Sequence, residues 1–519
     1  MKILYTSIFT LFFTLSSIGQ NTFNIRTNYG FPAAVLSSVI PTDSCIYASG
    51  IIADSVFPYN TGAIFIKMDV SAQMLLLKTL TSTQKTFEPW FGGLKSLPGG
   101  SFIMPAYSID STMKTVLIKY NHLGDTLFTR EYFNPFYPAQ DFIQPRGGIA
   151  ICKNGESVTN NWITISDANT NIYLIKTDSN GKVKWSKMLG DNYWERPSSI
   201  LATDNGCVII GGIKTNDNMT TENFSYRTFL TGLDTSGQIQ WTWLSPESWG
   251  LRDAARDMVL LEDGSLVIAS GIGHEQQRPS VNVVYFDKAV FKLNPQRELE
   301  WEVVFPDPEL TASSRLSKII RPQNGSGFII AGMIAEDLPG VNTAEVRGWI
   351  AKISNDGDSL WKREYVVLDN GFNHHEIYDM KETPDGGLII CGESRDRTPG
   401  VDTPQQAWLM KLDSFGCLVP GCQLIDATEE AQAQGTLLLY PNPARDYLNF
   451  FYRPAPGQNS RELSFRIFDA SGRELQRFEA QSGEATYIVP LWHWPPGVYF
   501  LQLLHEGLPV RTERFVVGR

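Results

Sequence analysis

One phrase recurs seven times along the chain: an aliphatic run, a Lys-Leu-Asp-like step, a tight turn and then a large apolar residue. The copies read IFIKMDVSAQMLL, VLIKYNHLGDTLF, YLIKTDSNGKVKW, FLTGLDTSGQIQW, VFKLNPQRELEW, IAKISNDGDSLW and WLMKLDSFGCLVP. Internal repetition with a period of roughly 50 residues is typical of propellers and other repeat architectures. The repeat therefore constrains the fold more than any property of the composition.

Each copy of the phrase is predicted to form a β-hairpin. Three residues after the Asp-like position the sequence has Gly in five copies, with Ala72 and Arg297 in the other two. Glycine at that offset supplies the positive φ that a short hairpin turn needs. The residue seven positions after the Asp-like one is expected to lie in the second strand of the hairpin and to pack between neighbouring repeats. These residues are Leu76, Phe128, Trp185, Trp241, Trp301, Trp361 and Pro420.

A second type of hairpin lies between the phrases and also occurs seven times, most copies having Asp-Gly, Asn-Gly or Gly-Gly between apolar runs. Two hairpins per repeat make one four-stranded blade of a β-propeller. The repeats begin with the second type at residues 36–52 and end with the first type at residues 408–420. We therefore expect an all-β fold in which residues 22–422 form a seven-bladed β-propeller closed by N- and C-terminal half-blades, because this pairing hides two sheet edges.

The loops of such a propeller divide between two faces. The turns within the phrases point to one face, and the longer connections between hairpins point to the other, where binding residues usually lie. Aromatic and histidine residues gather in these long connections, and aromatic rings stack on sugars or on partner proteins. Packing between blades explains the same aromatic residues equally well. The ligand-binding candidates are Trp90, Phe91, Tyr193, Trp194, Trp249, His374 and His375.

Catalytic signatures are absent from the sequence, which has no HExxH, no GxSxG and no phosphate-binding glycine loop that opens a helix. The run His374-His375-Glu376 is a weak metal candidate because adjacent strand residues point to opposite faces. We expect two solvent-facing loop histidines there, and neither a metal nor a cofactor. The prediction is a non-enzymatic module that binds a surface glycan or protein. The alternative is a secreted glycan-active hydrolase or lyase that uses carboxylates on the long-loop face.

Charge and the first residues indicate the compartment. The net charge of −11 argues against a nucleic-acid partner, because phosphates require a basic face. Lys2, the apolar run from Ile3 to Leu15 and the small residues Ser17 and Gly19 predict a secretory signal peptide at residues 1–19. Elsewhere in the sequence no apolar stretch is long enough to span a bilayer, so we expect no integral membrane segment after signal cleavage.

The composition changes towards the C-terminus. Cys417 and Cys422 enclose a tight Leu-Val-Pro-Gly segment and are the predicted disulfide pair. A polar linker rich in Ala and Gln is predicted at residues 423–436. Residues 437–519 then contain nine Arg and no Lys. Short segments with alternating faces, separated by turn residues, predict a small immunoglobulin-like β-sandwich there.

Four motifs stand in order within this last segment: Leu439–Ala444, Ile467–Gly472, Pro496–Phe500 and a basic-apolar end at Arg514–Arg519. Together they resemble the type A sorting domain of the type IX secretion system of Bacteroidetes. The resemblance implies that the type IX secretion machinery carries the chain from the periplasm to the cell surface or the medium. An ordinary immunoglobulin-like appendage is the alternative. The residues of the implied sorting motif are Tyr440, Pro441, Asn442, Pro443, Pro496, Gly497, Tyr499, Arg514 and Arg519.

Overall fold

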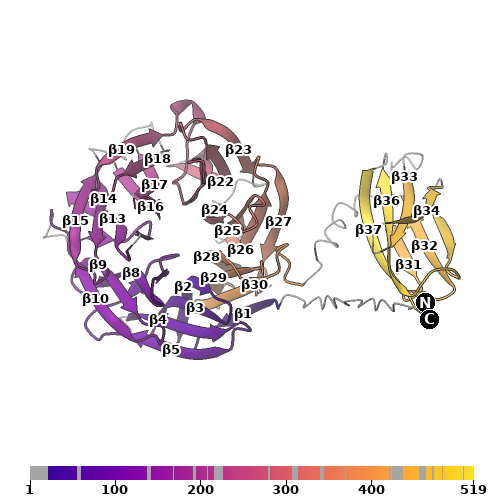
Figure 1. Cartoon of the computed structure of the whole chain (residues 1–519), viewed down its shortest axis with the longest axis horizontal. Coiled ribbons are helices and arrows are strands. Elements are labelled where there is room, and N and C mark those ends of the chain that lie inside the picture. The colour runs from indigo at the N-terminus through magenta and orange to yellow at the C-terminus, as the bar shows by residue number, and fades with distance from the viewer. Residues whose placement is uncertain are drawn as a thin grey trace, which may run out of the picture. The chain divides into compact units, whose positions relative to one another are not determined.

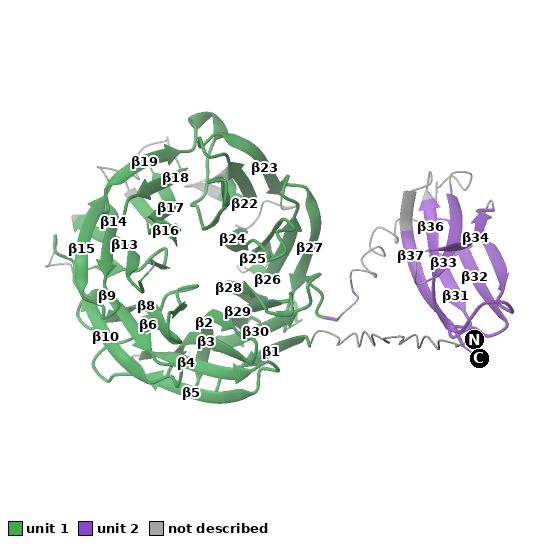
Figure 2. Cartoon of the chain, viewed as in Figure 1, with its two compact units in different colours: residues 1–418 green, residues 419–519 purple. Residues whose placement is uncertain are grey.

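The computed structural model divides into two compact units, residues 1–418 and 419–519 (Figure 2). The predicted signal peptide and, apart from Thr436, the predicted linker lie outside the described residues. In the described part of the chain, no helix is long and apolar enough to cross a membrane. The structure describes residues 21–54, 60–136, 142–152, 154–166, 169–190, 194–206, 208–215, 226–278, 281–306, 314–338, 344–368, 370–401, 403–419, 422, 436–454, 463–469, 473–481, 483–505 and 508–518.

The first unit is a β-propeller, whose sheets stand around a central axis (Figure 1). Three sheets have four antiparallel strands in sequence order. They are β2 (Ala33–Pro41), β3 (Cys45–Ala53), β4 (Thr61–Asp69) and β5 (Met74–Leu80); β16 (Trp194–Ala202), β17 (Val208–Thr215), β18 (Tyr226–Leu233) and β19 (Ile239–Leu244); and β20 (Asp257–Leu260), β21 (Leu266–Arg278), β22 (Val281–Leu293) and β23 (Leu299–Phe305). A short 3-10 helix, η2 (Glu247–Trp249), precedes β20.

Two further sheets have five strands because their first strand is split into two short pieces. They are β6 (Glu88–Pro89), β7 (Lys95–Leu97), β8 (Ser101–Ile109), β9 (Met113–Tyr120) and β10 (Thr126–Tyr132); and β11 (Ile143–Gln144), β12 (Ile149–Ile151), β13 (Ser157–Ser166), β14 (Asn169–Thr177) and β15 (Val183–Leu189). In each case both pieces pair with the same following strand, so the blade keeps its up-and-down order.

The last sheet has eight strands in two halves, which one parallel bridge between Val346 and His374 joins. The first half contains β24 (Arg315–Ile320), β25 (Phe328–Asp337), β26 (Ala344–Ile353) and β27 (Ser359–Tyr365). The second half contains β28 (Asn373–Glu382), β29 (Leu388–Asp396), β30 (Gln406–Leu412) and β1 (Phe23–Thr27), the first strand of the chain.

A single strand closes the ring, as Figure 1 shows where β1 lies beside β30. Asn24 in β1 accepts a hydrogen bond from the indole N–H of Trp408 in β30 at 2.6 Å. The hairpin at residues 36–52 belongs, as β2 and β3, to one sheet with β4 and β5. The expected closure by two half-blades is therefore wrong. The short strand β1, which precedes the first hairpin, pairs with the free edge of β30. Each hairpin therefore stays in one sheet with a hairpin that is adjacent to it in the sequence.

The turn of the repeated phrase has the predicted backbone. Asp178, at the Asp-like position, accepts hydrogen bonds from the backbone N–H groups of Asn180 and Lys182, both at 2.9 Å. The residue three positions after the Asp-like one has a positive φ in all seven copies, including Ala72 and Arg297. The local sequence thus determines this turn even where glycine is absent.

The bulky residue of the phrase packs beneath the turn of the next blade. A Cβ placed on Gly237 would lie 3.0 Å from the ring of Trp185, and one on Gly416 would lie 2.6 Å from the ring of Trp361. The indole N–H of Trp185 also donates to the carbonyl of Thr235 at 3.2 Å. The turn glycines therefore provide both the positive φ and the space for a neighbouring tryptophan, which confirms the predicted packing between repeats.

The second unit consists of two sheets around one core. A three-stranded sheet contains β31 (Thr436–Tyr440), β32 (Tyr447–Arg453) and β35 (Ala485–Pro490), and a four-stranded sheet contains β34 (Glu474–Glu479), β33 (Leu463–Asp469), β36 (Gly497–His505) and β37 (Leu508–Val517). Alternate residues of the strands point inward, so Phe450 and Tyr452 of one sheet share a buried cluster with Phe465 and Ile467 of the other.

Candidate functional site

The innermost strands of the propeller are interrupted where they border a central cavity. Register shifts in β2, β16, β24 and β28 leave one residue in each strand without a partner opposite: Ser37, Ser198, Ser317 and Tyr378. In the two split strands the interruption covers residues 90–94 and 145–148. Such interruptions bend a strand and redirect its side chains. Residues at or beside most of these interruptions line a cavity of about 330 Å³.

Positive charge dominates the wall of this axial cavity. Five cationic residues and two carboxylates line it: Lys95, Arg146, Arg256, Arg315 and Lys318 with Asp257 and Glu376. Lys318 pairs with Asp257 at 2.9 Å, and Arg315 pairs with Glu376. Arg256 pairs at 2.8 Å with Asp253. Three of the five cations are therefore neutralised by a neighbouring carboxylate.

Lys95 and Arg146 form no ion pair with any carboxylate of the described residues. The ammonium of Lys95 donates to the carbonyl of Gly92 at 3.2 Å. Burial, together with repulsion from Lys381 and Lys318, lowers the pKa of Lys95 to about 8. The guanidinium of Arg146 lies over the ring of Trp162, 4.5 Å from its centroid. These two residues leave the cavity with a net positive charge.

Polar side chains of the innermost strands also hold neighbouring blades together. Asp379 is fully buried, accepts a hydrogen bond from the backbone N–H of Val39 at 3.1 Å and pairs with Lys381 at 2.6 Å. Burial opposes its charge, but Lys381 and two further lysines outweigh that effect and lower the pKa of Asp379. In the same way, the hydroxyl of Ser38 accepts a hydrogen bond from the backbone N–H of Leu94 at 3.1 Å. These contacts fix the wall of the cavity.

A second cavity of about 310 Å³ is lined mainly by β2 and β3, with Glu88 and Glu393 among the other lining residues. Phe91 and Tyr378 line both cavities. Glu88 accepts hydrogen bonds from the hydroxyls of Tyr107 and Thr61. The charged residues that line the second cavity are therefore carboxylates, whereas cations outnumber carboxylates in the first.

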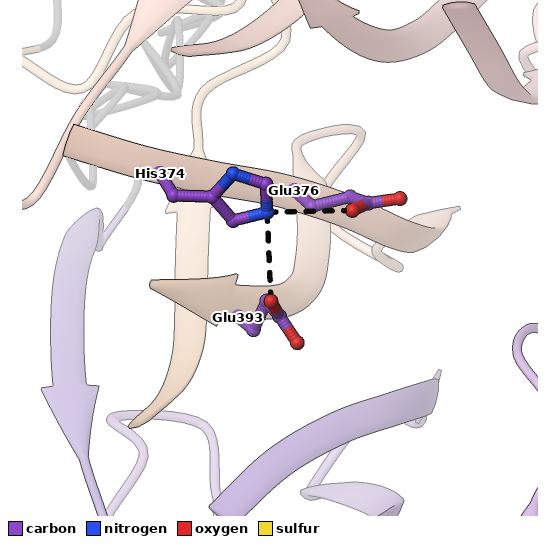
Figure 3. Close-up of side chains that lie close together, drawn as sticks. All are labelled: His374, Glu376 and Glu393. Atoms are coloured by element: carbon purple, nitrogen blue, oxygen red, sulfur yellow. Dashed lines mark ion pairs between the residues drawn. The ribbon is translucent and has the colours of Figure 1, made fainter. Parts of the chain in front are cut away.

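A cluster of one histidine and two glutamates lies on β28 and β29 (Figure 3). His374 and Glu376 share a face of β28, and Glu393 lies directly opposite Glu376 on β29. The Nε2 atom of His374 lies 3.6 Å from one oxygen of each glutamate. Burial and the charge of Glu376 raise the pKa of Glu393. Burial opposes the charge of Glu376, but His374 and Arg315 lower its pKa.

The two predicted histidines are both buried, so the expectation of solvent-facing loop residues is wrong. They lie in β28, where alternation sends them to opposite faces. His375 accepts hydrogen bonds from the backbone N–H groups of Val367 and Leu368 at 3.0 and 3.2 Å and packs against Trp408. Burial lowers the pKa of His375 to about 4. The innermost strand of this blade extends further than the hairpin pattern alone indicates.

The aromatic candidates are in different surroundings. Trp90 and Phe91 line the axial cavity. Trp249 lies in η2, where its ring packs against Trp243 and Phe291 with centroids 5.8 and 5.9 Å apart. Trp194 begins β16 opposite Thr215, and its side chain, like all of Tyr193, lies outside the described residues. The cavity therefore brings together Trp90 and Phe91 from the predicted set.

Sequence reasoning missed the cations of the axial cavity. Arg146 precedes a Gly-Gly pair, Arg256 follows an Ala-Ala pair and Lys318 follows Ser317. In each case the basic residue lies just before or within the apolar start of the second hairpin type. A basic residue next to small residues at this repeated position was a signal that could have found the site.

Comparison with known proteins adds the decisive observation for the C-terminal unit: residues 438–518 match the model of the secretion system C-terminal sorting domain. The chain is a cargo of the type IX secretion system. The cargo protein is therefore exported to the cell surface or the medium, as the resemblance of its last motifs implies. No curated protein matches the cargo protein.

Solved structures resemble the cargo protein at low identity. A protein of unknown function from Dyadobacter fermentans is 10% identical, with 75% of this chain and 99% of that chain covered and a TM-score of 0.39. A family PL25 ulvan lyase is 9% identical, with 75% and 96% covered and a TM-score of 0.47. An α-L-arabinanase from Penicillium chrysogenum is 11% identical, with 76% and 98% covered and a TM-score of 0.39. Similarity at this level says nothing about a ligand.

The sorting-motif residues of the cargo protein tie the ends of its second unit together. The side-chain amide of Asn442, between Pro441 and Pro443, accepts a hydrogen bond from the N–H of Val516 at 2.9 Å and donates to the carbonyl of Arg514 at 3.2 Å. Tyr440 ends β31, and the peptide bonds before both prolines are cis. These residues are therefore part of a folded unit and not of a linear peptide.

Gly497 begins β36 and Pro496 directly precedes it. The hydroxyl of Tyr499 donates to the carbonyl of Pro495 at 2.6 Å. Arg519 lies outside the described residues. In the first unit, Cys417 is disulfide-bonded, and so is Cys422 in the second unit. Cys45 and Cys391 are not disulfide-bonded.

Proposed function

We propose that this cargo protein is a surface or secreted binding module whose axial cavity takes an anionic glycan, carrying carboxylate or sulfate groups. Counting each half of the eight-stranded sheet as one blade, the binding unit is a seven-bladed propeller. The second unit is an immunoglobulin-like β-sandwich that serves export. We propose no cofactor for glycan binding by the propeller.

The observation that carries the proposal is the pair of cations without carboxylate partners, Lys95 and Arg146, on the cavity wall. Charged groups that are removed from water are unfavourable unless an opposite charge or hydrogen bonds compensate them. Arginine binds carboxylate and sulfate-like groups through two parallel hydrogen bonds, and charge-assisted bonds are about twice as strong as neutral ones. An anionic ligand would therefore satisfy the wall better than water does.

The other lining residues favour a sugar as the carrier of the anion. Trp90 and Phe91 provide aromatic surface at the same cavity, with ring centroids 5.7 Å apart. Aromatic faces pack well on the apolar faces of sugar rings because both are flat and partly apolar. The volume of about 330 Å³ lies within the range of small-molecule pockets, roughly 300–1,000 Å³. One or two sugar units fit this space.

The test is calorimetric titration of the exported protein with a galacturonate disaccharide and a sulfated chondroitin disaccharide, with cellobiose as the neutral comparison. We expect binding of one or both charged sugars and none of cellobiose. Replacing Lys95→Met together with Arg146→Met should weaken the binding by about 100-fold or more, since each charge-assisted hydrogen bond contributes about 1.5–3 kcal/mol. The matched control, Lys182→Met with Arg321→Met, removes two exposed cations outside the cavity. Equal binding of cellobiose, or unchanged affinity in the cavity variant, would refute the proposal.

A second candidate function, cleavage of a glycan, is supported by Glu376 and Glu393. One oxygen of each lies within 4.8 Å of the other, and each glutamate borders one of the two cavities. Retaining glycosidases hold their two carboxyl groups about 5–5.5 Å apart. New reducing ends, or the ultraviolet absorbance of an unsaturated product, would reveal cleavage of the same disaccharides or of longer chains. Loss of that product in Glu393→Gln would assign the activity to this pair.

A further inference from the structure

We propose that His374, Glu376 and Glu393 bind a divalent transition-metal ion beside the cavities. The proposal goes beyond glycan binding and does not depend on it, because the three ligands are distinct from Lys95 and Arg146. They come from two neighbouring strands of one blade, β28 and β29, which hold their Cα positions rigidly. The site therefore needs no contribution from a mobile segment.

The distances within the cluster suit ligands around an ion better than hydrogen bonds. Nε2 of His374 lies 3.6 Å from Oε2 of Glu376 and 3.6 Å from Oε1 of Glu393, which is too long for a hydrogen bond. Two ligand atoms that each lie about 2.1 Å from a zinc ion in a tetrahedral arrangement are separated by about 3.4 Å. Three ligand atoms within 4.8 Å of one another need only small side-chain rotations to reach that arrangement.

The second carboxylate oxygen of Glu376 has a partner that leaves the first oxygen available as a ligand. Arg315 contacts Oε1 of Glu376, so that Oε2 is the oxygen directed towards His374. Hydrogen bonds to the outer side of metal ligands orient them and are a regular feature of metal sites. In Figure 3 dashed lines join one imidazole nitrogen of His374 to one carboxylate oxygen of Glu376 and to one of Glu393.

The ligand set determines the class of ion. One imidazole nitrogen with two carboxylate oxygens suits Zn²⁺ or Mn²⁺, whereas Ca²⁺ and Mg²⁺ prefer oxygen ligands alone. His374 is only 8% exposed and Glu393 only 7%, so the ion would be shielded from bulk water. Three protein ligands leave at least one coordination position open. Because Glu393 also lines the second cavity, that position is accessible to a small ligand there.

The experiment measures metal content and thermal stability of the exported protein. The protein is first stripped with a chelator, then incubated with Zn²⁺, Mn²⁺ or Ca²⁺ and desalted, and the bound metal is determined by elemental analysis. We expect about one equivalent of Zn²⁺ or Mn²⁺ per chain and a higher melting temperature in the presence of that ion. The apo protein should remain folded, because the three residues are a small part of the blade.

Variants that keep a polar side chain of similar size make the test independent of folding. His374→Gln and Glu393→Gln should each weaken binding of the ion by at least about 100-fold, and the melting temperature of either variant should not respond to it. The control His122→Ala removes an exposed turn histidine and should bind like the wild type. The proposal would be overturned if the wild type retained no metal, if it bound Ca²⁺ alone, or if the two variants bound the ion as tightly as the wild type. None of these results alters the expected effect of Lys95 and Arg146 on sugar binding.

Discussion

The ring of Phe91 stacks on the ring of Tyr378, with centroids 3.9 Å apart and planes inclined by 20°. The two residues come from the interruption after β6 and from the register shift in β28, in the two blades that flank the blade of β2–β5. Because both residues line the axial cavity and the second cavity, the stacked pair forms a shared wall between the two cavities. The wall is a consequence of two strand irregularities that lie far apart in the sequence.

Replacing Phe91→Ala should reduce sugar binding more than stability. Phe91 is 37% exposed, so its removal should lower the free energy of unfolding by less than about 1.5 kcal/mol. Loss of the stack and of the sugar-facing surface should weaken binding of the charged disaccharide about 10-fold, in line with aromatic pair energies. Calorimetric titration and urea unfolding measure the two effects. Phe415→Ala, which removes a more exposed ring (50%) in a turn outside the cavity, is the control. An unchanged affinity for Phe91→Ala would contradict the role of the wall.

Replacing Lys95→Met should stabilise the protein while it weakens anion binding. The pKa of Lys95 falls from 10.5 to about 8 in the folded protein. Between these values the unfolded chain holds a proton that the folded protein has released, so stability rises with pH through this window. Below pH 8 the folded protein carries the whole penalty of the buried charge. Lys95→Met should therefore raise the free energy of unfolding at neutral pH by about 1–3 kcal/mol, and this gain should shrink as the pH rises from 8 towards 10.5.

The protonation state of Lys95 should also determine the affinity for an anionic ligand. An anion is attracted to the protonated form of Lys95, so affinity should be highest below pH 8 and should fall above it. The groups that act on Lys95 are Lys381 and Lys318, which repel its charge, and Asp379 and Asp257, which favour it. Titrations at several pH values should show this decline in the wild type and a flatter profile in Lys95→Met. A decline of the same size in both proteins would exclude Lys95 as its source.

Two glycine substitutions separate backbone strain from packing between blades. Gly416 and Gly386 have similar positive φ values, +72° and +78°. A Cβ on Gly416 would lie 2.6 Å from the ring of Trp361, whereas a Cβ on Gly386 would meet nothing within 4 Å. Both changes to Ala should lower the free energy of unfolding by about 1–2 kcal/mol, because a left-handed backbone disfavours a residue with a Cβ. Gly416→Ala should lower it by about 1–3 kcal/mol more, because its Cβ displaces Trp361. Equal losses in urea unfolding would mean that the tryptophan moves aside freely.

Removal of residues 437–519 should leave a folded propeller inside the outer membrane. The buried core of the second unit, from Leu437 to Val517, consists of residues within that unit, so its loss removes no core residue of the ring. The match to the sorting domain covers residues 438–518, and we expect this domain to direct the chain across the outer membrane. Antibody labelling of intact cells, compared with labelling after lysis, measures the location. Labelling of intact cells that produce the truncated protein would contradict the assignment of export to this domain.

The predicted part of the fold rests on features that a few neighbouring residues determine. The turn at Asp178 could be predicted because its side chain caps its own turn, and the residue at Gly237 needs a positive φ whatever the rest of the chain does. The packing of Trp185 beneath the next turn follows from the same period. Trp90 and Phe91 are predictable as binding candidates because they lie in a long connection between hairpins. The two-sheet fold of the last unit follows likewise from alternation along each strand.

Sequence by itself thus determined the hairpins, their turns, the compartment and the sorting domain, all of which depend on local pattern. Tertiary structure alone decided that β1 closes the ring, since five residues outside the repeats carry no periodic signal. It also decided that Lys95 and Arg146 line the same cavity, and that Glu393 lies opposite Glu376. The physical reason is that the register of each innermost strand, and the place where it bulges, depend on how all the blades pack around one axis.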